Sequence, residues 1–488
     1  YMRIASTLAV HTPDPGTWKE KFFDIMWKGW LSPSTPILAN TGTNRGLPVS
    51  CAGSYVPDSI DGVYKAKHET AMLTKMGFGT AGYLGDVRPR GSSISVGGKS
   101  SGVMQVIEGF QKDMEYVAQG TARRGSWAGY LPIDHGDFME VCTFLEQQPD
   151  GLNLGWNVSD AFIERLKNKD PDAIARYKKA MKTKMITGKG YFFFPDKTAR
   201  KRPKWYVDQG LDVKAPQLCN EVLLHSSKDY TYTCVLASMN VERFDEWVNT
   251  DAVFTATVFL DAVCQEFIER AKNIPGLEKA VAFTKNSRAL GLGQCGLHSY
   301  FQKNMIAFES FEAHMLNNKI AKYIQDEAIK ASEWLAQTWG EPLWMKGYGR
   351  ANTHLIAIAP TKSTALIMGG VSEGINPDTA FVYTQKSAGG EIDRVNPYLL
   401  KIMKERGVYN KANVESIREK MGSVQHVDWL TEEEKLVFRT AFEINQQTII
   451  RMAATRAKFM DQWQSLNLFF AAGEDESCLL YTSDAADE

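Results

Sequence analysis

A thiol and a carboxylate stand two residues apart in APQLCNEVLLHSSKDYTYTCVLASMN, where Cys219 precedes Glu221 and another thiol, Cys234, follows. If the first part of this stretch is extended, Cys219 and Glu221 point to the same side, because strand side chains alternate with a period of two. The carboxylate can then take a proton from an alcohol, while the thiol exchanges a hydrogen atom or a proton. The spacing indicates radical or redox chemistry on a hydroxyl-bearing substrate. Packing of both thiols in a core, with a solvated Glu221, is the competing interpretation.

A second candidate site lies in APTKSTALIMGG, residues 359–370, where an apolar run ends and hydroxyl side chains lead into a predicted helix. Hydroxyls and free backbone N–H groups at a helix start can bind an anion such as a phosphate. Ordinary capping of the helix by Ser363 or Thr364 is the competing interpretation.

Two other patterns argue against common alternatives. The GxGxxG matches at 77–82 and 291–296 lack the strand-then-helix context of a dinucleotide site, so they indicate turns or close backbone approach. A cysteine protease would need a histidine placed as a base, and no histidine lies in a protease signature.

The elements that must position these residues are predicted as helices alternating with short apolar strands. The helical periodicity and end signals are found at 251–273, 309–338 and 431–464, the last beginning with a capping-box pattern in TEEE. Short buried-looking strands are predicted at 190–195, 232–239 and 354–360. This alternation favours an α/β fold with a largely parallel sheet in a single domain.

Composition and charge narrow the function further. The chain has 488 residues and a formal net charge of −1, which is not the electrostatic footprint of a protein that binds nucleic acid. Its seven cysteines are widely spaced without a CxxC, which argues against a disulfide scaffold or a zinc ribbon. No run approaches the roughly 20 apolar residues of a membrane span, and no signal-peptide pattern is visible. We therefore expect a cytoplasmic protein with no membrane partner.

The end of the sequence has an unusual composition. Residues 478–488, CLLYTSDAADE, resemble the translation of a sequencing-library adapter. We expect residues 1–477 to form one catalytic domain, incomplete at both ends, and exclude the last eleven residues from it.

Taken together, the motifs resemble the large, catalytic subunit of class I ribonucleotide reductase, in that family's order from about Leu31 to Leu468. They are LSPSTPILANTG with PVSC, PQLCNE, YTCVLASMN, NSRALGLG, APTKST with EGINP, and KFMDQWQSLNLF. The resemblance implies a ten-stranded α/β barrel, built from two five-stranded parallel halves arranged antiparallel to each other. An inner finger loop would carry the radical cysteine.

The resemblance also implies a reaction and its residues. Cys219 would become a thiyl radical and abstract the 3′ hydrogen of a ribonucleoside diphosphate, while Glu221 accepts the 3′-hydroxyl proton. Cys51 and Cys234 would release the 2′-hydroxyl as water and finish as a disulfide. Gln217 stands where the family usually has Asn, and it keeps the amide donor and acceptor on a longer stem.

Binding sites follow from the same resemblance. The substrate phosphates would be bound by the backbone near Gly77 and by four hydroxyl side chains, those of Thr35, Ser50, Ser363 and Thr364. Lys362 stands where many relatives have an acidic or small residue. An allosteric site for deoxynucleoside triphosphates or ATP, at the interface of a homodimer, would use Asp58 and Arg88. The loop AQGTARRGSWAG would sense the base through Gln119 and Arg123.

No cofactor is expected to bind this subunit directly. The resemblance implies a radical made by a metallo-cofactor in a separate small subunit, and re-reduction of the disulfide by thioredoxin or glutaredoxin. The radical-transfer tyrosines and the C-terminal cysteines of the family are expected beyond this sequence. Two alternatives stay open: a class II enzyme that uses adenosylcobalamin, and a nucleotide-binding relative that has lost catalysis. Retention of the three cysteines and Glu221 argues against the second.

Overall fold

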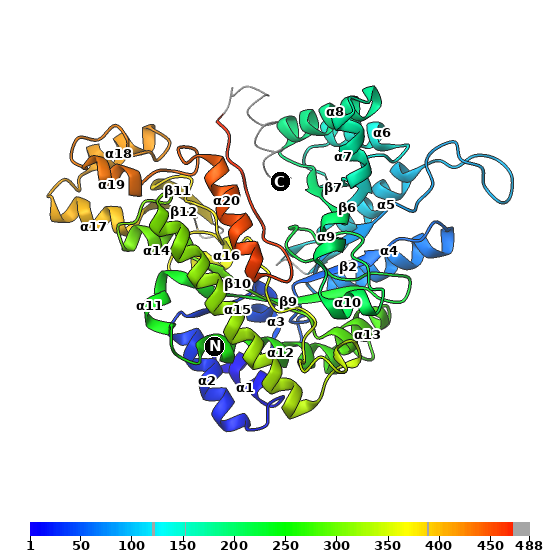
Figure 1. Ribbon diagram of the computed structural model, residues 1–488, viewed down its shortest axis with the longest axis horizontal. Coiled ribbons are helices and arrows are strands. Elements are labelled where there is room, and N and C mark those ends of the chain that lie inside the picture. The colour runs from blue at the N-terminus through cyan, green and yellow to red at the C-terminus, as the bar shows by residue number, and fades with distance from the viewer. Residues whose placement is uncertain (120–122, 152, 388–389, 472–488) are drawn as a thin grey trace.

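The computed structural model describes residues 1–119, 123–151, 153–387 and 390–471 (Figure 1). The chain folds around a mixed eight-stranded sheet. Its strands are β1 (Leu31–Pro33), β2 (Cys51–Tyr55), β3 (Gly79–Tyr83), β6 (Trp127–Pro132), β7 (Asn153–Asn157), β8 (Tyr191–Phe193), β9 (Tyr232–Asn240) and β10 (Leu290–Cys295). Two hairpins lie apart from it: β4 (Ala118–Gln119) with β5 (Arg123–Arg124), and β11 (Val382–Ser387) with β12 (Gly390–Val395).

The sheet has two parts that run in opposite directions. Strands β2, β3, β6, β7 and β8 pair in parallel in that order. Strand β9 is antiparallel to β2 and to β1, and β10 lies parallel to β9. Single bridges extend this second part, from Leu292 to Ile356 and from Ile358 to Gln464. The α/β class is confirmed, as a curled mixed sheet with an antiparallel junction between β2 and β9.

Helices provide the crossovers that parallel neighbours require. They are α4 (Ile60–Lys75), α5 (Val103–Tyr116), α6 (Phe138–Gln147), α7 (Asp160–Lys167) and α8 (Pro171–Thr187) in the first part, and α12 (Ala252–Ala271) and α13 (Glu278–Ser287) between β9 and β10. Several of these helices have a side-chain cap at their first turn. In α4 the Ser59 hydroxyl accepts from the Gly62 N–H. Phe110 of α5 stacks on Trp127 of β6 with centroids 4.4 Å apart, which buries that face of the sheet.

The remaining helices pack around this frame. They are α1 (Met2–Ala9), α2 (Pro15–Trp27), α3 (Thr35–Asn40), α9 (Pro195–Lys201), α10 (Lys204–Asp208), α11 (Phe244–Trp247), α14 (Leu297–Lys303), α15 (Phe311–Trp339), α16 (Lys362–Ile367), α17 (Pro397–Glu405), α18 (Lys411–Glu419), α19 (Glu432–Val437) and α20 (Gln446–Arg456). Figure 1 shows α17, α18 and α19 grouped at one end and α6, α7 and α8 at the other. The main core joins α1, α2, α12 and α15 to β9 and β10.

The helix predictions were partly right. The helices predicted at 251–273 and 309–338 are confirmed as α12 and α15. The continuous helix predicted over 431–464 is wrong, because α19 ends at Val437 and α20 begins only at Gln446. Between them Phe438 and Ala441 are buried, and Asn445 caps α20 through the Gln447 N–H. The capping box of Thr431 and Glu434 is confirmed.

The strand predictions at 190–195 and 232–239 are confirmed as β8 and β9, but a strand over 354–360 is wrong. Only Ile356 and Ile358 make bridges there. The N–H groups of Leu355 and Ile356 donate to the two carboxylate oxygens of Asp461, at 2.8 and 2.9 Å. At Leu355 and Ile356 the Asp461 carboxylate therefore takes the place of the backbone carbonyls that a neighbouring strand would supply.

We expect Asp461→Ala to lower the free energy of unfolding by about 2–4 kcal/mol, because it leaves two buried backbone N–H groups without an acceptor. Chemical denaturation of the purified chain measures this loss. Asp326→Ala is the matched control, since Asp326 makes only an exposed i,i+4 ion pair with Lys322, and it should cost less than about 1 kcal/mol. Equal losses in the two variants would show that the hydrogen bonds from Leu355 and Ile356 to Asp461 add no more stability than an exposed ion pair.

Candidate active site

Cys219 lies at the tip of a loop without regular structure that leads into β9. Asn220 adopts a left-handed conformation, with φ of 70°, and its N–H donates to the Gln217 carbonyl at 3.1 Å. The Gln217 N–H donates to the Val222 carbonyl at 3.3 Å, which closes the turn. The extended conformation considered for Cys219 and Glu221 is therefore wrong. A tight turn, and not strand alternation, sets the directions of these two side chains.

Four hydrogen bonds fix the loop tip. The Tyr130 hydroxyl of β6 donates to the Gln217 carbonyl at 2.9 Å, and the Gln217 side-chain oxygen accepts from the Cys219 N–H at 2.9 Å. On the far side, the Trp463 N–H donates to the Glu221 carbonyl at 2.9 Å, and the Leu223 N–H donates to Gln462 Oε1 at 3.1 Å. The tip is thus held between β6 and residues 461–465.

Glu221 is a buried carboxyl with unused hydrogen-bonding capacity. Its side chain is 1% exposed, and Oε2 has no hydrogen-bond partner among the described residues. Burial raises its pKa to about 7, although a backbone N–H and the Gln217 amide partly oppose that shift. A carboxyl that titrates near neutrality can accept a proton from a substrate hydroxyl and release it again.

Cys51 and Cys234 are direct cross-strand neighbours in the antiparallel pairing of β2 with β9. Opposite residues of such a pair have Cα atoms about 4.5–5.5 Å apart, within the range of about 4.4–6.8 Å that a disulfide spans. Both thiols are free, and burial raises the pKa of each well above its usual value, with the Glu221 charge adding to the shift. They can form a disulfide without movement of the backbone.

The loop tip and the thiol pair share one environment. Cys51 Sγ accepts from the Gln217 side-chain amide at 3.7 Å, which connects the loop to β2. Burial is the main cause that raises the pKa of Cys51 and of Tyr191. Negative charge on Cys219 and Glu221 raises both pKa values further. The structure therefore brings together all five predicted catalytic residues: Gln217, Cys219, Glu221, Cys51 and Cys234.

The two glycine patterns make room for this site. A Cβ at Gly79 would lie 3.3 Å from the Leu218 side chain of the loop tip. A Cβ at Gly291 would lie 3.0 Å from Cys234 Sγ and would also collide with Leu236. Close approach, one of the two interpretations favoured from the sequence, is what these glycines permit.

The candidate phosphate residues lie on neighbouring elements. Thr35 opens α3, directly after Ser34, whose hydroxyl accepts from Ser50 at 2.6 Å. Ser32 of β1 donates to the Thr364 carbonyl of α16 at 3.4 Å. Thr361, and neither Ser363 nor Thr364, is the N-cap of α16, and its hydroxyl accepts from the Gly374 N–H. Ser363 and Lys362 are exposed on the first turn.

Gly77 follows the end of α4 and lies two residues before Gly79, whose N–H donates to the Ser50 carbonyl at 2.9 Å. It has a φ of 103°, and its N–H donates to the Thr74 carbonyl at 2.9 Å.

The candidate effector residues are also brought together. Arg88 Nε contacts Asp58 Oδ2 at 2.7 Å, and the Arg88 N–H donates to the same carboxylate at 3.2 Å. Gln119 and Arg123 are opposite each other in the β4–β5 hairpin, and α4 packs against β4. Residues 120–122 of the predicted base-sensing loop lie outside the described residues.

Sequence reasoning missed Tyr130 and Gln462. Tyr130 lies in an apolar run, WAGYLP, and nothing in its spacing connects it with the loop. Gln462 lies in the quoted motif KFMDQWQSLNLF, so its position was visible but its contact with Leu223 was not.

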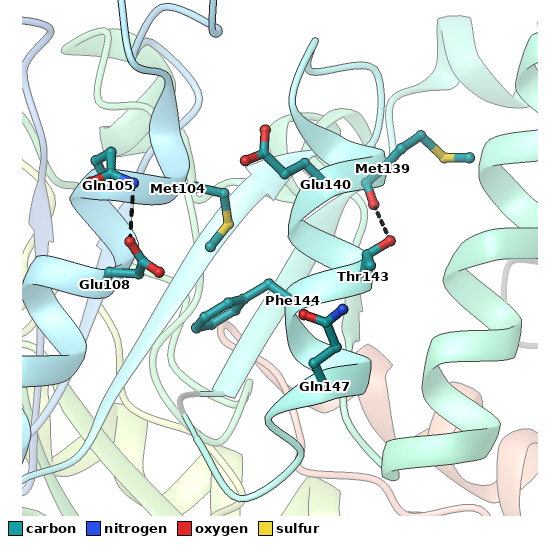
Figure 2. A pocket seen from close by; sticks show the side chains of 8 residues that line it. All are labelled: Met104, Gln105, Glu108, Met139, Glu140, Thr143, Phe144 and Gln147. Atoms are coloured by element: carbon teal, nitrogen blue, oxygen red, sulfur yellow. Dashed lines mark hydrogen bonds between the residues drawn. The ribbon is translucent and has the colours of Figure 1, made fainter.

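A surface groove lies apart from this chemistry. It has a volume of about 440 Å³ between α5 and α6, and it is lined by Met104, Gln105, Glu108, Met139, Glu140, Thr143, Phe144 and Gln147 (Figure 2). Its lining holds no cysteine or histidine, and Gln105 and Glu108 bond to each other there. Over the described parts of the chain, no three His, Cys, Asp or Glu side chains cluster as metal ligands, and no helix is long and apolar enough to cross a membrane.

Comparison with known proteins identifies the family. The model of the ribonucleotide reductase barrel domain matches residues 49–176, 172–344 and 343–482, and the model of the all-alpha domain matches residues 1–46. The chain belongs to the family of class I ribonucleotide reductase large subunits.

Relatives and solved structures agree with this family. A putative ribonucleoside-diphosphate reductase large subunit of Frog virus 3 is 37% identical, covering 94% of this chain and 84% of its own. The ribonucleoside-diphosphate reductase large subunit of Invertebrate iridescent virus 3 is 30% identical, covering 93% and 83%. The Actinobacillus ureae class Id ribonucleotide reductase alpha subunit superposes with a TM-score of 0.91 at 40% identity, over 99% of this chain and 91% of that one. The class I prediction is confirmed, and the comparisons do not favour the adenosylcobalamin alternative.

We expect Glu221→Gln to change how stability depends on pH. The buried carboxyl has a pKa of about 7 when folded and an ordinary value of 4.5, so the folded state holds the extra proton between these values. Stability of the unchanged chain should fall as pH rises through that window. The free energy of unfolding of the Gln variant, measured relative to that of the unchanged chain, should therefore increase by up to about 3 kcal/mol from pH 4.5 to above 7.

Denaturation at several pH values measures this difference. Glu432→Gln, at an exposed position, controls for the loss of one charge. A constant difference between the Glu221→Gln variant and the unchanged chain across the window would contradict a pKa raised by burial.

Proposed function

We propose that this chain reduces ribonucleoside diphosphates to 2′-deoxyribonucleotides for DNA synthesis through a thiyl radical on Cys219. The observation that carries this proposal is the position of Cys219. It lies on a fixed turn, connected through Gln217 to a cross-strand thiol pair and two residues from a buried carboxyl that titrates near neutrality. Radical chemistry requires exclusion of water, and burial of Glu221, Cys51 and Cys234 supplies it.

Each residue has a role that its surroundings support. The partner subunit supplies the oxidising equivalent that removes the Cys219 hydrogen atom. The Cys219 sulfur then takes the 3′ hydrogen of the ribose and returns it at the end, while Glu221 accepts the 3′-hydroxyl proton. Cys51 and Cys234 give two electrons and two protons, so the 2′-hydroxyl leaves as water and the two sulfurs bond. Gln217 holds the loop tip and contacts the Cys51 sulfur.

The substrate diphosphate is proposed to lie where β1, α3 and α16 meet. Thr35 and Ser363 are exposed on the first turns of α3 and α16. Ser50 donates to Ser34, next to Thr35, and the Thr364 carbonyl accepts from Ser32. Exposed hydroxyls beside helix starts suit phosphate oxygens. Backbone near Gly77 is proposed to complete the site, and Lys362 adds positive charge at its rim.

Regulation is proposed at a separate site. Asp58 and Arg88 already contact each other, and a deoxynucleoside triphosphate or ATP would bind beside them at a homodimer interface. Gln119 and Arg123 would pass the identity of the effector base toward the substrate.

The remaining proposals concern partners and architecture. A metallo-cofactor in a small subunit would generate the radical, and thioredoxin or glutaredoxin would re-reduce the disulfide in the cytoplasm. Residues 1–477 are proposed to form one reductase domain, whose sheet and bridges would close as a ten-stranded barrel around the finger loop.

In the complete enzyme with its small subunit, we expect Cys219→Ser to lower deoxynucleotide formation by at least about 10³-fold, because serine cannot carry the radical step. Product assay by chromatography measures the rate, and calorimetry should show unchanged binding of the diphosphate. Cys142→Ser, at a buried cysteine on α6 outside the site, is the matched control and should keep its activity. Turnover by the Cys219→Ser variant would refute the assignment of the radical.

The pH profile of the unchanged enzyme provides a second check on Glu221. Its carboxylate form must act as the base, so the rate should rise with pH through about 7. A profile that is flat between about pH 6 and 8, in a range where the partner subunit is unaffected, would argue against this role.

A further inference from the structure

Gln462 contacts three parts of the active site with a single side chain. Its Oε1 accepts from the N–H of Leu223, on the loop that carries Cys219, at 3.1 Å. Its Nε2 donates to the Leu290 carbonyl of β10 at 2.8 Å and lies 3.8 Å from Cys234 Sγ, within hydrogen-bond range for sulfur. The side chain is 4% exposed. It therefore connects the loop that carries Cys219 to one member of the thiol pair.

We propose that Gln462 is a positioning residue that stabilises Cys234 as the leaving thiolate when an external dithiol reduces the Cys51–Cys234 disulfide. This inference rests on the proposed redox role of the pair. It adds a direction to the exchange, with attack at Cys51 and departure of Cys234.

Exposure supports that direction. Cys51 is 8% exposed, whereas Cys234 is fully buried, so we expect an incoming thiolate to reach the Cys51 sulfur first. In thiol–disulfide exchange the leaving sulfur departs as a thiolate, and its stability sets the rate. Burial opposes ionisation of Cys234 and raises its pKa, and the Gln462 amide is the foremost group that favours the anion. Loss of the Gln462 amide should therefore slow the departure of the Cys234 thiolate from the disulfide.

The exchange balances in two steps. A thiolate of the external dithiol attacks Cys51 Sγ, the Cys51–Cys234 bond breaks, and Cys234 leaves with the electron pair and then takes a proton. The second thiol of the reductant then attacks its own sulfur in the mixed disulfide and releases Cys51. The reductant becomes a disulfide, and both cysteines end as thiols.

Gln217 does not replace Gln462 in this role. Its amide nitrogen contacts Cys51 Sγ at 3.7 Å, but its oxygen holds the Cys219 N–H, so it serves the attacked sulfur and the loop tip. The two glutamines thus contact opposite members of the pair.

The test measures reduction of the disulfide by dithiothreitol in the chain itself. The chain is oxidised with diamide, the Cys51–Cys234 link is confirmed by peptide mass spectrometry, and its reduction is followed by quench and alkylation. Gln462→Met, which removes the amide but keeps an unbranched side chain, should slow reduction about three- to tenfold. Gln462→Glu keeps the acceptor for Leu223 but puts a negative charge beside the departing sulfur, and it should be slower still at about pH 8.

Gln464→Met is the matched control. Gln464 lies on the same segment, where it accepts from Arg456 and donates to the Ala453 carbonyl, away from both sulfurs. If Gln462 acts only on the fold, the two Met variants should lose similar stability and keep the same reduction rate. That result would overturn the inference while leaving the redox pair intact.

Two further outcomes separate the proposals. If the unchanged chain forms no Cys51–Cys234 disulfide under oxidation, the redox pair fails, and this inference fails with it. If the disulfide forms, the single substitutions Cys234→Ala and Cys51→Ala, followed at the remaining cysteine of the pair by peptide mass spectrometry, report the direction of attack. Cys51 in the first should form a mixed disulfide with 5,5′-dithiobis(2-nitrobenzoate) at least about tenfold faster than Cys234 in the second. Equal rates would overturn the proposed direction.

Discussion

The site depends on one constraint: a polar loop tip must be held inside the molecule without water. The tip contains a buried carboxyl, which is unfavourable there, and a half-buried Asn220 in the left-handed conformation. Its backbone groups are therefore paired with β6 through Tyr130 and with residues 461–465 through Trp463. Because the tip is fixed from both sides, the cost of burying Glu221 appears as a raised pKa and not as a displaced loop.

The mixed sheet positions the thiol pair. Its antiparallel junction between β2 and β9 sets Cys51 directly against Cys234. The β10 strand then pairs with β9, and Gly291 leaves room there for the Cys234 sulfur. The pairing of β2 with β9 is thus the feature that sets the two thiols opposite each other.

The sequence allowed prediction of what depends on local pattern. The strand at 232–239 and the helices α12 and α15 follow from apolar runs and end signals, and the cysteines follow from motifs. Contacts between distant segments have no such pattern. The Asp461 carboxylate replaces strand pairing at Leu355, and Gln462 reaches Leu223, but a polar residue in an extended segment looks the same whether it faces solvent or a loop. The turn at Asn220 is closed by local bonds between Asn220, Gln217 and Val222, but it was missed because the spacing of Cys219 and Glu221 also fits a strand.

Residues 461–465 connect the two halves of the chemistry. Their backbone bonds to the loop through Glu221 and to residues 356–358, while the Gln462 side chain reaches β10 and the sulfur of Cys234. A shift of this segment would change the position of Cys219 and the surroundings of the thiol pair together. Hydrogen bonds that share one rigid segment are not independent, so their effects on catalysis should not add. The segment, more than any single side chain, therefore fixes the position of the loop that carries Cys219 relative to Cys234.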